Sequence, residues 1–230
     1  GWPSQWEGYH WPGYTYEHTL RVRDLAMELA AREGANLQVV ELASLLHDIR
    51  KDAGKGHAQV GAEESEHILK KLGVRAKVRR RVCEAIALHS GDNKSDSPRE
   101  SLCLGDADLI DSNFGLVATW RFITIRSGHD TALEDTIRGM SEWLPKKDGL
   151  LSWLLTRSGR EIARQRSARM RVFCGQLLEE LGRPPEHRNG VMKAAGHFHE
   201  SRGSTLLAAQ VRALEMLCEE APQESLSVIC

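Results

Sequence analysis

The chain has 230 residues, with 31 Lys or Arg and 32 Asp or Glu side chains, so its formal net charge is −1 with neutral histidines. This balance argues against a protein whose main role is to coat nucleic acid or an acidic membrane. A composition that is 41% hydrophobic and 27% charged is ordinary for a globular domain, and it excludes a wholly disordered chain.

Taken in chain order, the sequence begins with an aromatic segment. Residues 1–16 hold all three tyrosines and three of the six tryptophans, and we expect an irregular arm that either packs on the domain or lines a ligand pocket. From Thr15 onward, the spacing of His18, Val22, Leu25 and Leu29 predicts one face of a helix. Further helices are predicted over 37–49, 58–72, 76–89, 102–122, 131–143 and 149–181, with loops at 53–56 and 90–98 and an interruption near Gly115.

No segment alternates apolar and polar residues with a period of two, so the predicted fold class is all-α. Residues 17–182 are expected to form the main domain. After Leu181 the chain becomes polar and rich in glycine, although an amphipathic helix over 205–220 fits the pattern. We predict that residues 183–230 are an appendage rather than a second folded domain, and whether it is partly disordered stays open.

The sequence also predicts a compartment. No stretch approaches the roughly 20 apolar residues that cross a bilayer, and no signal peptide is visible. The five cysteines are widely scattered and form no C-x-x-C pair, which disfavours a zinc-ribbon site and favours a reducing environment. We therefore expect a cytoplasmic monomer or homodimer, with no membrane and no nucleic-acid polymer among its partners.

A set of histidines and aspartates carries the chemistry. His47 and Asp48 are adjacent at the end of an apolar helix, where both side chains can leave the core. His18 and His89 lie on apolar helix faces, where an unpaired imidazole is costly to bury. Asp108 lies among apolar residues, and a cation would compensate its charge. Nitrogen and oxygen ligands of these types suit Mn²⁺, Fe²⁺, Ni²⁺, Co²⁺ or Zn²⁺ better than Ca²⁺, and Mg²⁺ is left open.

These residues belong to strings that resemble the HD superfamily of metal-dependent phosphohydrolases, and especially its small stand-alone bacterial and archaeal members. The matching strings are Glu17–Val22, Glu33–Ala35, Glu41–Ile49, Gly56–Glu63, Ala85–Ser90 and Asp106–Asp111, with a later match over Thr156–Met170. The resemblance implies an HD-domain helical bundle with extra C-terminal helices. It also implies a metal held by His18, His47, Asp48 and Asp108, with Asp106 as the rival for the last ligand.

The resemblance assigns roles around the metal as well. His57 and His89 match positions that, in some relatives, bind a second metal or the substrate phosphate, and we count both as candidate catalytic residues. Lys51, with Arg50 as its substitute, is a candidate phosphate clamp, although a solvated charge is an equal reading. Asp52 is a candidate general base.

Two arginines of the later string, Arg160 and Arg166, are candidate contacts to substrate phosphates, and the alternative is a charged helix face. The implied function is a phosphohydrolase that uses metal-activated water on a small phosphate ester or anhydride, with a nucleotide expected as substrate. Relatives commonly carry His-Asp-Trp just before the first ligand, where this chain has Tyr14-Thr15-Tyr16, so the substrate of relatives does not transfer directly. The alternatives are a dinuclear-iron oxygenase and a non-catalytic nucleotide-binding regulatory module.

Overall fold

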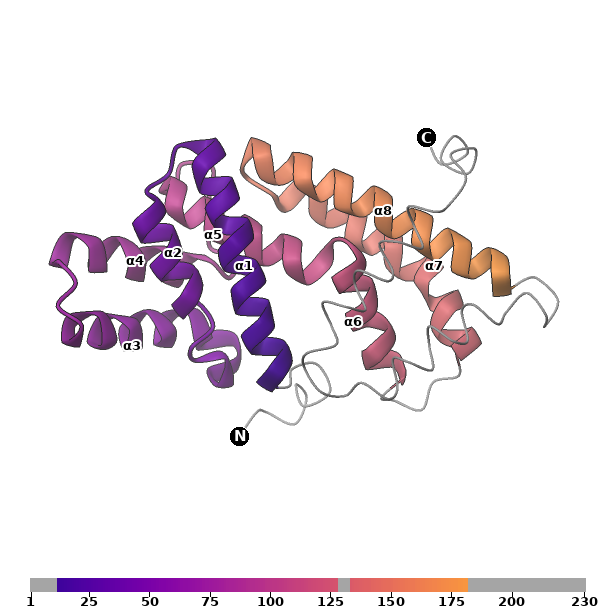
Figure 1. Ribbon diagram of the computed structural model, residues 1–230, viewed down its shortest axis with the longest axis horizontal. Coiled ribbons are helices and arrows are strands. Elements are labelled where there is room, and N and C mark those ends of the chain that lie inside the picture. The colour runs from indigo at the N-terminus through magenta and orange to yellow at the C-terminus, as the bar shows by residue number, and fades with distance from the viewer. Residues whose placement is uncertain (1–11, 128–132, 182–230) are drawn as a thin grey trace. The chain divides into compact units, whose positions relative to one another are not determined.

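The computed structural model describes residues 12–127 and 133–181 (Figure 1). These residues form helices and no strand, which confirms the all-α fold class. The chain divides into two compact units. The first comprises the residues up to Ser112 together with Ser152–Ile162, and the second comprises Asn113–Leu151 and the residues from Ala163 onward. Residues 1–11 of the aromatic arm and the predicted 183–230 appendage lie outside the described part, so those two predictions stay open.

The first unit begins with two helices whose ends follow from the sequence. Helix α1 (Pro12–Glu33) starts with a proline, which lacks the N–H that a first helical turn leaves unbonded. It ends before Gly34, whose φ of 70° is a conformation that glycine adopts easily. In α2 (Leu37–Leu46), the Asn36 side chain caps the first turn by accepting from the Val39 N–H. Residues 12–16 are thus helical, whereas the sequence predicted an irregular arm.

A short 3₁₀ helix, η2 (Lys51–Gly56), follows α2 where the sequence predicted a loop. Helices α3 (His57–Lys71) and α4 (Ala76–Leu88) then form an antiparallel pair, and α5 (Arg99–Asn113) completes the unit (Figure 1). The apolar stripes predicted for α1 and α4 are buried, as the spacing required. Their buried members include Val22, Leu25, Leu29, Val82 and Ile86.

The second unit contains α6 (Leu116–Ser127), α7 (Leu133–Gly149) and the part of α8 (Arg157–Leu181) that begins at Ala163. Its core joins apolar side chains of all three helices: Leu116, Ile123, Ile137, Met140, Met170, Phe173, Cys174, Leu177 and Leu181. Gly115, with a φ of 98°, separates α5 from α6, which confirms the interruption predicted there.

One predicted helix is divided in the structure. The segment 149–181 contains η3 (Leu150–Trp153) and a turn before α8 begins at Arg157. The backbone N–H groups of Leu155 and Thr156 donate long-range hydrogen bonds to the Asp106 carboxylate and so stabilise this turn. Apolar periodicity carries no information about such bonds. Within the described residues, no helix combines the length and the apolar character that a bilayer span requires.

Candidate metal centre

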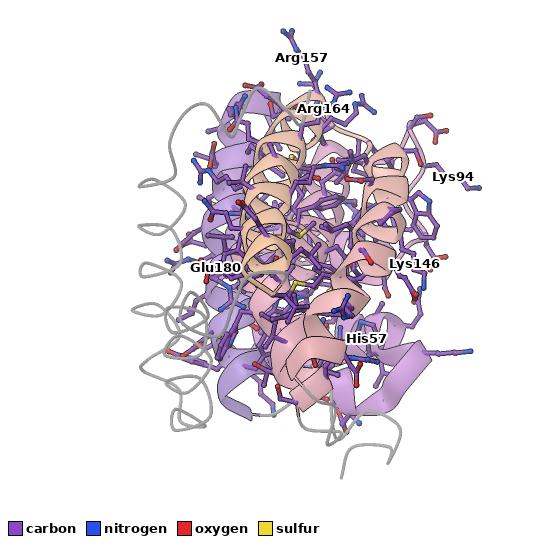
Figure 2. The ribbon with its side chains drawn as sticks, turned by 90° about the vertical axis from the view of Figure 1, so that its right-hand side faces the viewer. His57, Lys94, Lys146, Arg157, Arg164 and Glu180 are labelled. Atoms are coloured by element: carbon purple, nitrogen blue, oxygen red, sulfur yellow. The ribbon has the colours of Figure 1, made fainter. Side chains whose placement is uncertain are left out.

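The first unit brings the predicted metal ligands and the two candidate catalytic histidines to one place, from positions on or directly after its helices α1 to α5. Each residue lies at a helix end or on an inward helix face, and all but the partly exposed Asp108 are buried. The set comprises His18 of α1, His47 and Asp48 just after α2, His57 at the start of α3, His89 just after α4, and Asp108 of α5. Figure 2 shows His57 beside the turn that leads into α3.

The Asp48 carboxylate lies in the middle of four imidazoles. Its oxygens are 3.4 Å from His57 Nε2, 3.6 Å from His47 Nε2, 3.7 Å from His89 Nε2 and 3.8 Å from His18 Nε2. The helix ends that carry these side chains therefore direct the same ring nitrogen of each histidine toward one carboxylate.

Two groups of side chains have the spacing of metal ligands. One ligand atom each from His18, His47 and Asp108 lie within 4.8 Å of one another, and the same holds for His47, Asp48 and His89. His18 Nε2 and Asp108 Oδ1 are 3.1 Å apart. His47 belongs to both groups, so the two overlap, and between them they contain all four of the predicted ligands together with His89.

Backbone carbonyls orient three of the histidines. In each case Nδ1 faces the carbonyl of the residue three positions earlier, and because a carbonyl only accepts, Nδ1 is the donor. The lone pair of Nε2 in the neutral ring then points into the centre, as metal ligation requires. The pairs are His47 with Ser44 O (2.7 Å), His57 with Gly54 O (2.8 Å) and His89 with Ile86 O (2.6 Å).

His18 has a different support, which the sequence analysis missed. Its Nδ1 lies 2.7 Å from Asp111 Oδ2, and the Arg21 guanidinium donates to both oxygens of that carboxylate, at 2.9 and 3.1 Å. A carboxylate behind a ligating histidine fixes the ring and raises its basicity. The sequence spacing could have indicated this support. Arg21 follows His18 by three residues and Asp111 follows Asp108 by three, which places each pair on one helix face.

Burial and charge separate the pKa values of the histidines. Burial lowers the pKa of His47 to about 4, so this ring is neutral at pH 7 and available as a ligand. For His18, burial acts in the same direction, but hydrogen bonds to Asp108 and Asp111 outweigh it and raise the pKa to about 9. A metal ion at His18 must therefore displace a proton near neutral pH.

The two central carboxylates are held ionised. Burial alone would raise the pKa of Asp48, but a hydrogen bond to His89 and the charges of Lys51 and His18 lower it well below its ordinary value. Burial would likewise raise the pKa of Asp108, and the hydrogen bond and charge of His18 lower it instead. Both groups are thus acceptors that need positive charge beside them.

The surroundings of His47 Nε2 show whether these side chains fit a cation. His47 Nε2 is fully buried and, among the described residues, has no hydrogen-bond partner. Its nearest polar neighbours include the anionic Asp48 oxygen at 3.6 Å, which cannot donate a hydrogen bond. A buried lone pair that faces carboxylate oxygens is unfavourable alone, and a divalent cation between them would satisfy both. The residues therefore fit a metal ion.

The rival ligand, Asp106, has other partners. Its carboxylate accepts from the N–H groups of Leu155 (3.0 Å) and Thr156 (2.7 Å) and from the Thr156 hydroxyl (2.7 Å). Two residues along an α-helix correspond to a rotation of about 200°, so Asp106 and Asp108 cannot face the same site. The structure brings Asp108, and not Asp106, to the histidines.

The other predicted residues divide into two sets. Lys51 Nζ lies 2.9 Å from the Asp48 carboxylate, and His57 Nε2 lies 3.3 Å from His89 Nε2, so these three join the centre. Asp52 is exposed and pairs with Arg50 at 3.2 Å. No hydrogen bond or ion pair among the described residues links Asp52 to the histidines, which gives no support to its role as general base.

The two arginines of the later string lie in different units. Arg160 donates to the Leu154 carbonyl at 2.8 Å, close to the turn that Asp106 stabilises. Arg166 belongs to the second unit, where its aliphatic stem lies beside Gly115. Both contacts are with other parts of the protein. The predicted contacts of the two arginines with substrate phosphates stay predictions.

Comparison with known proteins agrees with this geometry. The HD domain family model matches residues 15–113, a segment that carries all of the centre. This segment is an HD domain. No curated protein matches the chain by sequence.

Solved structures share the fold of this HD domain. A predicted HD superfamily hydrolase from an uncultured Thermotogales bacterium is 26% identical, with a TM-score of 0.54, over 76% of this chain and 88% of its own. Bacillus subtilis YpgQ, solved in complex with ADP, is 24% identical, with a TM-score of 0.57, over 74% and 91%. An HD-superfamily hydrolase from Bacillus thuringiensis is 22% identical, with a TM-score of 0.57, over 73% and 86%.

Proposed function

We propose that the chain is a divalent-metal-dependent phosphohydrolase that cleaves an ester or anhydride bond of a small phosphorylated molecule. The observation that carries this proposal is the buried, unpartnered Nε2 of His47 beside two ionised carboxylates. The metal would be held by His18, His47, Asp48 and Asp108. When bound there, such a cation supplies a water of lowered pKa and polarises phosphoryl oxygens.

Residues beside the proposed ligands would bind and orient the substrate. The Lys51 ammonium lies next to Asp48, where it can offset charge on a phosphoryl oxygen. Burial, followed by the charge of Lys51, lowers the pKa of His57. Burial acts against the charged form of His89 too, but a hydrogen bond to Asp48 raises its pKa. The pair, 3.3 Å apart, is therefore suited to hold one proton between them and to deliver it to a leaving oxygen.

We propose a nucleotide as the substrate class. The support is the ADP complex of B. subtilis YpgQ, a fold neighbour at 24% identity. That likeness concerns the fold, so the substrate must be decided by assay. The test is a release assay for inorganic phosphate or pyrophosphate, which crosses nucleoside mono-, di- and triphosphates and sugar phosphates with Mn²⁺, Co²⁺, Ni²⁺, Fe²⁺, Zn²⁺ and Mg²⁺.

The expected result is turnover of one nucleotide group with at least one of these metals, abolished in Asp48→Ala. His67→Ala is the matched control, because His67 is an exposed histidine of α3 that bonds only to the Glu63 carbonyl among the described residues. Tight nucleotide binding with no turnover under any metal would contradict the proposal and favour a regulatory module.

A second candidate function rests on the two overlapping ligand groups. Because His47, Asp48 and His89 could hold a second ion, a dinuclear iron oxygenase is the alternative. Metal analysis separates the two functions. Two irons per chain, with oxygen consumption and no phosphate release, would favour the oxygenase and contradict the hydrolase.

A further inference from the structure

The turn that joins α3 to α4 carries a concentration of positive charge. Between Lys70 and Arg81, seven of twelve residues are Lys or Arg and none is acidic. The remaining residues of the chain hold 24 basic and 32 acidic side chains. The near-zero charge of the whole chain therefore hides a strongly basic segment within an otherwise acidic protein.

Among the residues that the structure describes, acidic partners neutralise only two of these seven cations. Arg79 pairs with Glu66 at 2.8 Å, and Arg81 pairs with Glu100 at 2.5 Å. The other five side chains are exposed, and none of them forms an ion pair with a residue that the structure describes. We call these five the basic tip: Lys70, Lys71, Arg75, Lys77 and Arg80.

The tip cations at the start of α4 do not stabilise that helix. The first turn of α4 contains no acidic residue, and cations close to a helix N-terminus face the positive end of the helix dipole. Lys77 and Arg80, three residues apart, are neighbouring like charges on this helix, and neither has an ion-pair partner among the described residues, which is unfavourable. Lys70 and Lys71 lie in the last turn of α3, where the helix dipole favours a cation, so the unfavourable charges are those at the start of α4. An anion outside the chain is the partner that would compensate them.

An apolar side chain lies among the cations. Leu72, between Lys71 and Gly73 at the end of α3, is 71% exposed, the largest exposure of any large apolar residue that the structure describes. The phosphate groups of a nucleic acid are charged and offer no apolar contact for this leucine. At a lipid surface, by contrast, a leucine enters the interface while the surrounding lysines and arginines contact anionic headgroups.

The basic tip and the metal centre occupy opposite ends of the same helices. His57 begins α3 and Lys71 ends it, which corresponds to about 21 Å along the axis. His89 likewise follows the last residue of α4, whereas Arg75 precedes the first. In Figure 1, the turn between α3 and α4 lies at the left-hand edge of the first unit, away from the ends that approach α1. A surface bound by the tip would leave the metal centre uncovered.

We propose that the basic tip and Leu72 dock this protein onto an anionic lipid surface. The charge of the whole chain predicted no membrane partner, because an average does not register how charges are distributed along the helices. The interaction would be peripheral, since one leucine and five cations give reversible binding.

Vesicle co-sedimentation with the whole 230-residue chain tests the proposal. Vesicles of phosphatidylcholine with 30% phosphatidylserine should bind the protein, with affinity that falls as salt is raised, and vesicles of pure phosphatidylcholine should not. The triple variant Lys71→Gln, Arg75→Gln, Lys77→Gln should bind about 100-fold more weakly, at about fivefold for each charge. Leu72→Ser, which keeps every charge, should bind about tenfold more weakly.

A second triple variant controls for net charge. Arg157, Arg164 and Arg169 are exposed arginines of α8, and Figure 2 labels the first two at its N-terminal end. Changing these three to Gln removes the same charge and should leave vesicle binding within about twofold. Metal content and helical circular dichroism should be unchanged in all variants, since the altered residues lie away from the centre.

Three results would overturn the proposal. One is the absence of binding to the anionic vesicles at low salt. Another is an equal loss of binding in the α8 control, which would show a nonspecific charge effect. The third is salt-sensitive binding to single-stranded nucleic acid that Lys71→Gln, Arg75→Gln, Lys77→Gln abolishes and Leu72→Ser leaves intact, which would assign the tip to a nucleic acid instead.

Discussion

The two sides of helix α5 place the same residue type in opposite environments. On one side, Asp108 and Asp111 face His18, and Arg21 completes the pairing of Asp111. On the other side, Asp106 accepts hydrogen bonds from neutral groups of the turn before α8. All three carboxylates lie within six residues of one helix, and their rotation about its axis decides which partners they meet.

The pKa values record this difference. Burial raises the pKa of Asp106, because its neutral hydrogen-bond donors only partly compensate the lost hydration. Burial acts on Asp111 in the same direction, but the hydrogen bond to His18 and the charge of Arg21 reverse it and lower the pKa. The comparison teaches that burial alone does not mark a functional carboxylate. A functional carboxylate is marked instead by a cationic partner that directs the carboxylate toward other ligands.

The largest effect should come from Asp108. Asp108→Ala removes a proposed ligand, so we expect metal affinity to fall by more than 100-fold while the helical circular dichroism is retained. Isothermal titration with Mn²⁺ or Co²⁺ measures the affinity. If Asp108→Ala kept its metal and Asp106→Ala lost it, the assignment of the two sides of α5 would be reversed.

Asp106→Ala should act on stability instead. The substitution leaves two backbone N–H groups and the Thr156 hydroxyl without their acceptor, and we expect the free energy of unfolding to fall by about 2–4 kcal/mol. Urea denaturation at pH 7 measures this change. Metal affinity per folded molecule should stay within about threefold of the original protein, and a loss comparable to that of Asp108→Ala would contradict the prediction.

Asp111→Asn tests the support behind His18. Loss of a carboxylate behind a ligating histidine typically weakens metal binding by about 10- to 100-fold. The pH dependence sharpens the test. The pKa of His18 is raised to about 9, so below pH 9 a metal competes with a proton, and affinity should rise up to about tenfold per pH unit until that point.

In Asp111→Asn the pKa of His18 should fall, and the rise in affinity should level off at lower pH. Titrations between pH 6 and 9.5 in the original protein and the variant measure both effects. A metal affinity in Asp111→Asn equal to that of the original protein at every pH would show that the carboxylate has no part in positioning His18.

The smallest effect concerns Glu33, which accepts from the Ser158 N–H at 2.7 Å in the first turn of α8. Its hydrogen bonds with Ser158 outweigh its partial burial and lower its pKa below 4.5 in the folded state. This stabilisation is present above pH 4.5 and is lost as the pH falls through the folded-state pKa.

Glu33→Gln should therefore cost less than about 1 kcal/mol at pH 7 and close to nothing at pH 2.5. Urea denaturation at the two pH values measures the difference, with the exposed Glu64→Gln as a control. A cost that is equal at both pH values would exclude the carboxylate charge as its cause.

Much of this protein could be predicted from the sequence because the relevant information is local. The apolar periodicity of α1 and α4 identified their buried faces, and Gly115 marked the break between α5 and α6. The adjacent His47 and Asp48 at the end of an apolar helix indicated a site, since two polar ligands cannot remain in a core without partners. The strings around them identified the HD domain, and family comparison confirmed it.

Other features depend on which helices meet, and sequence spacing does not encode this. The choice of Asp108 over Asp106 follows from the rotation of α5 relative to α1 and to the turn at Thr156. The Arg21 and Asp111 support joins residues that are 90 positions apart. Asp52 lies only four residues beyond Asp48 but pairs with Arg50 at the surface. The sequence alone predicted most of the helices and the candidate ligands, because both predictions draw on neighbouring residues. Only the tertiary structure decided which carboxylate faces which cation, because that depends on the packing of distant helices.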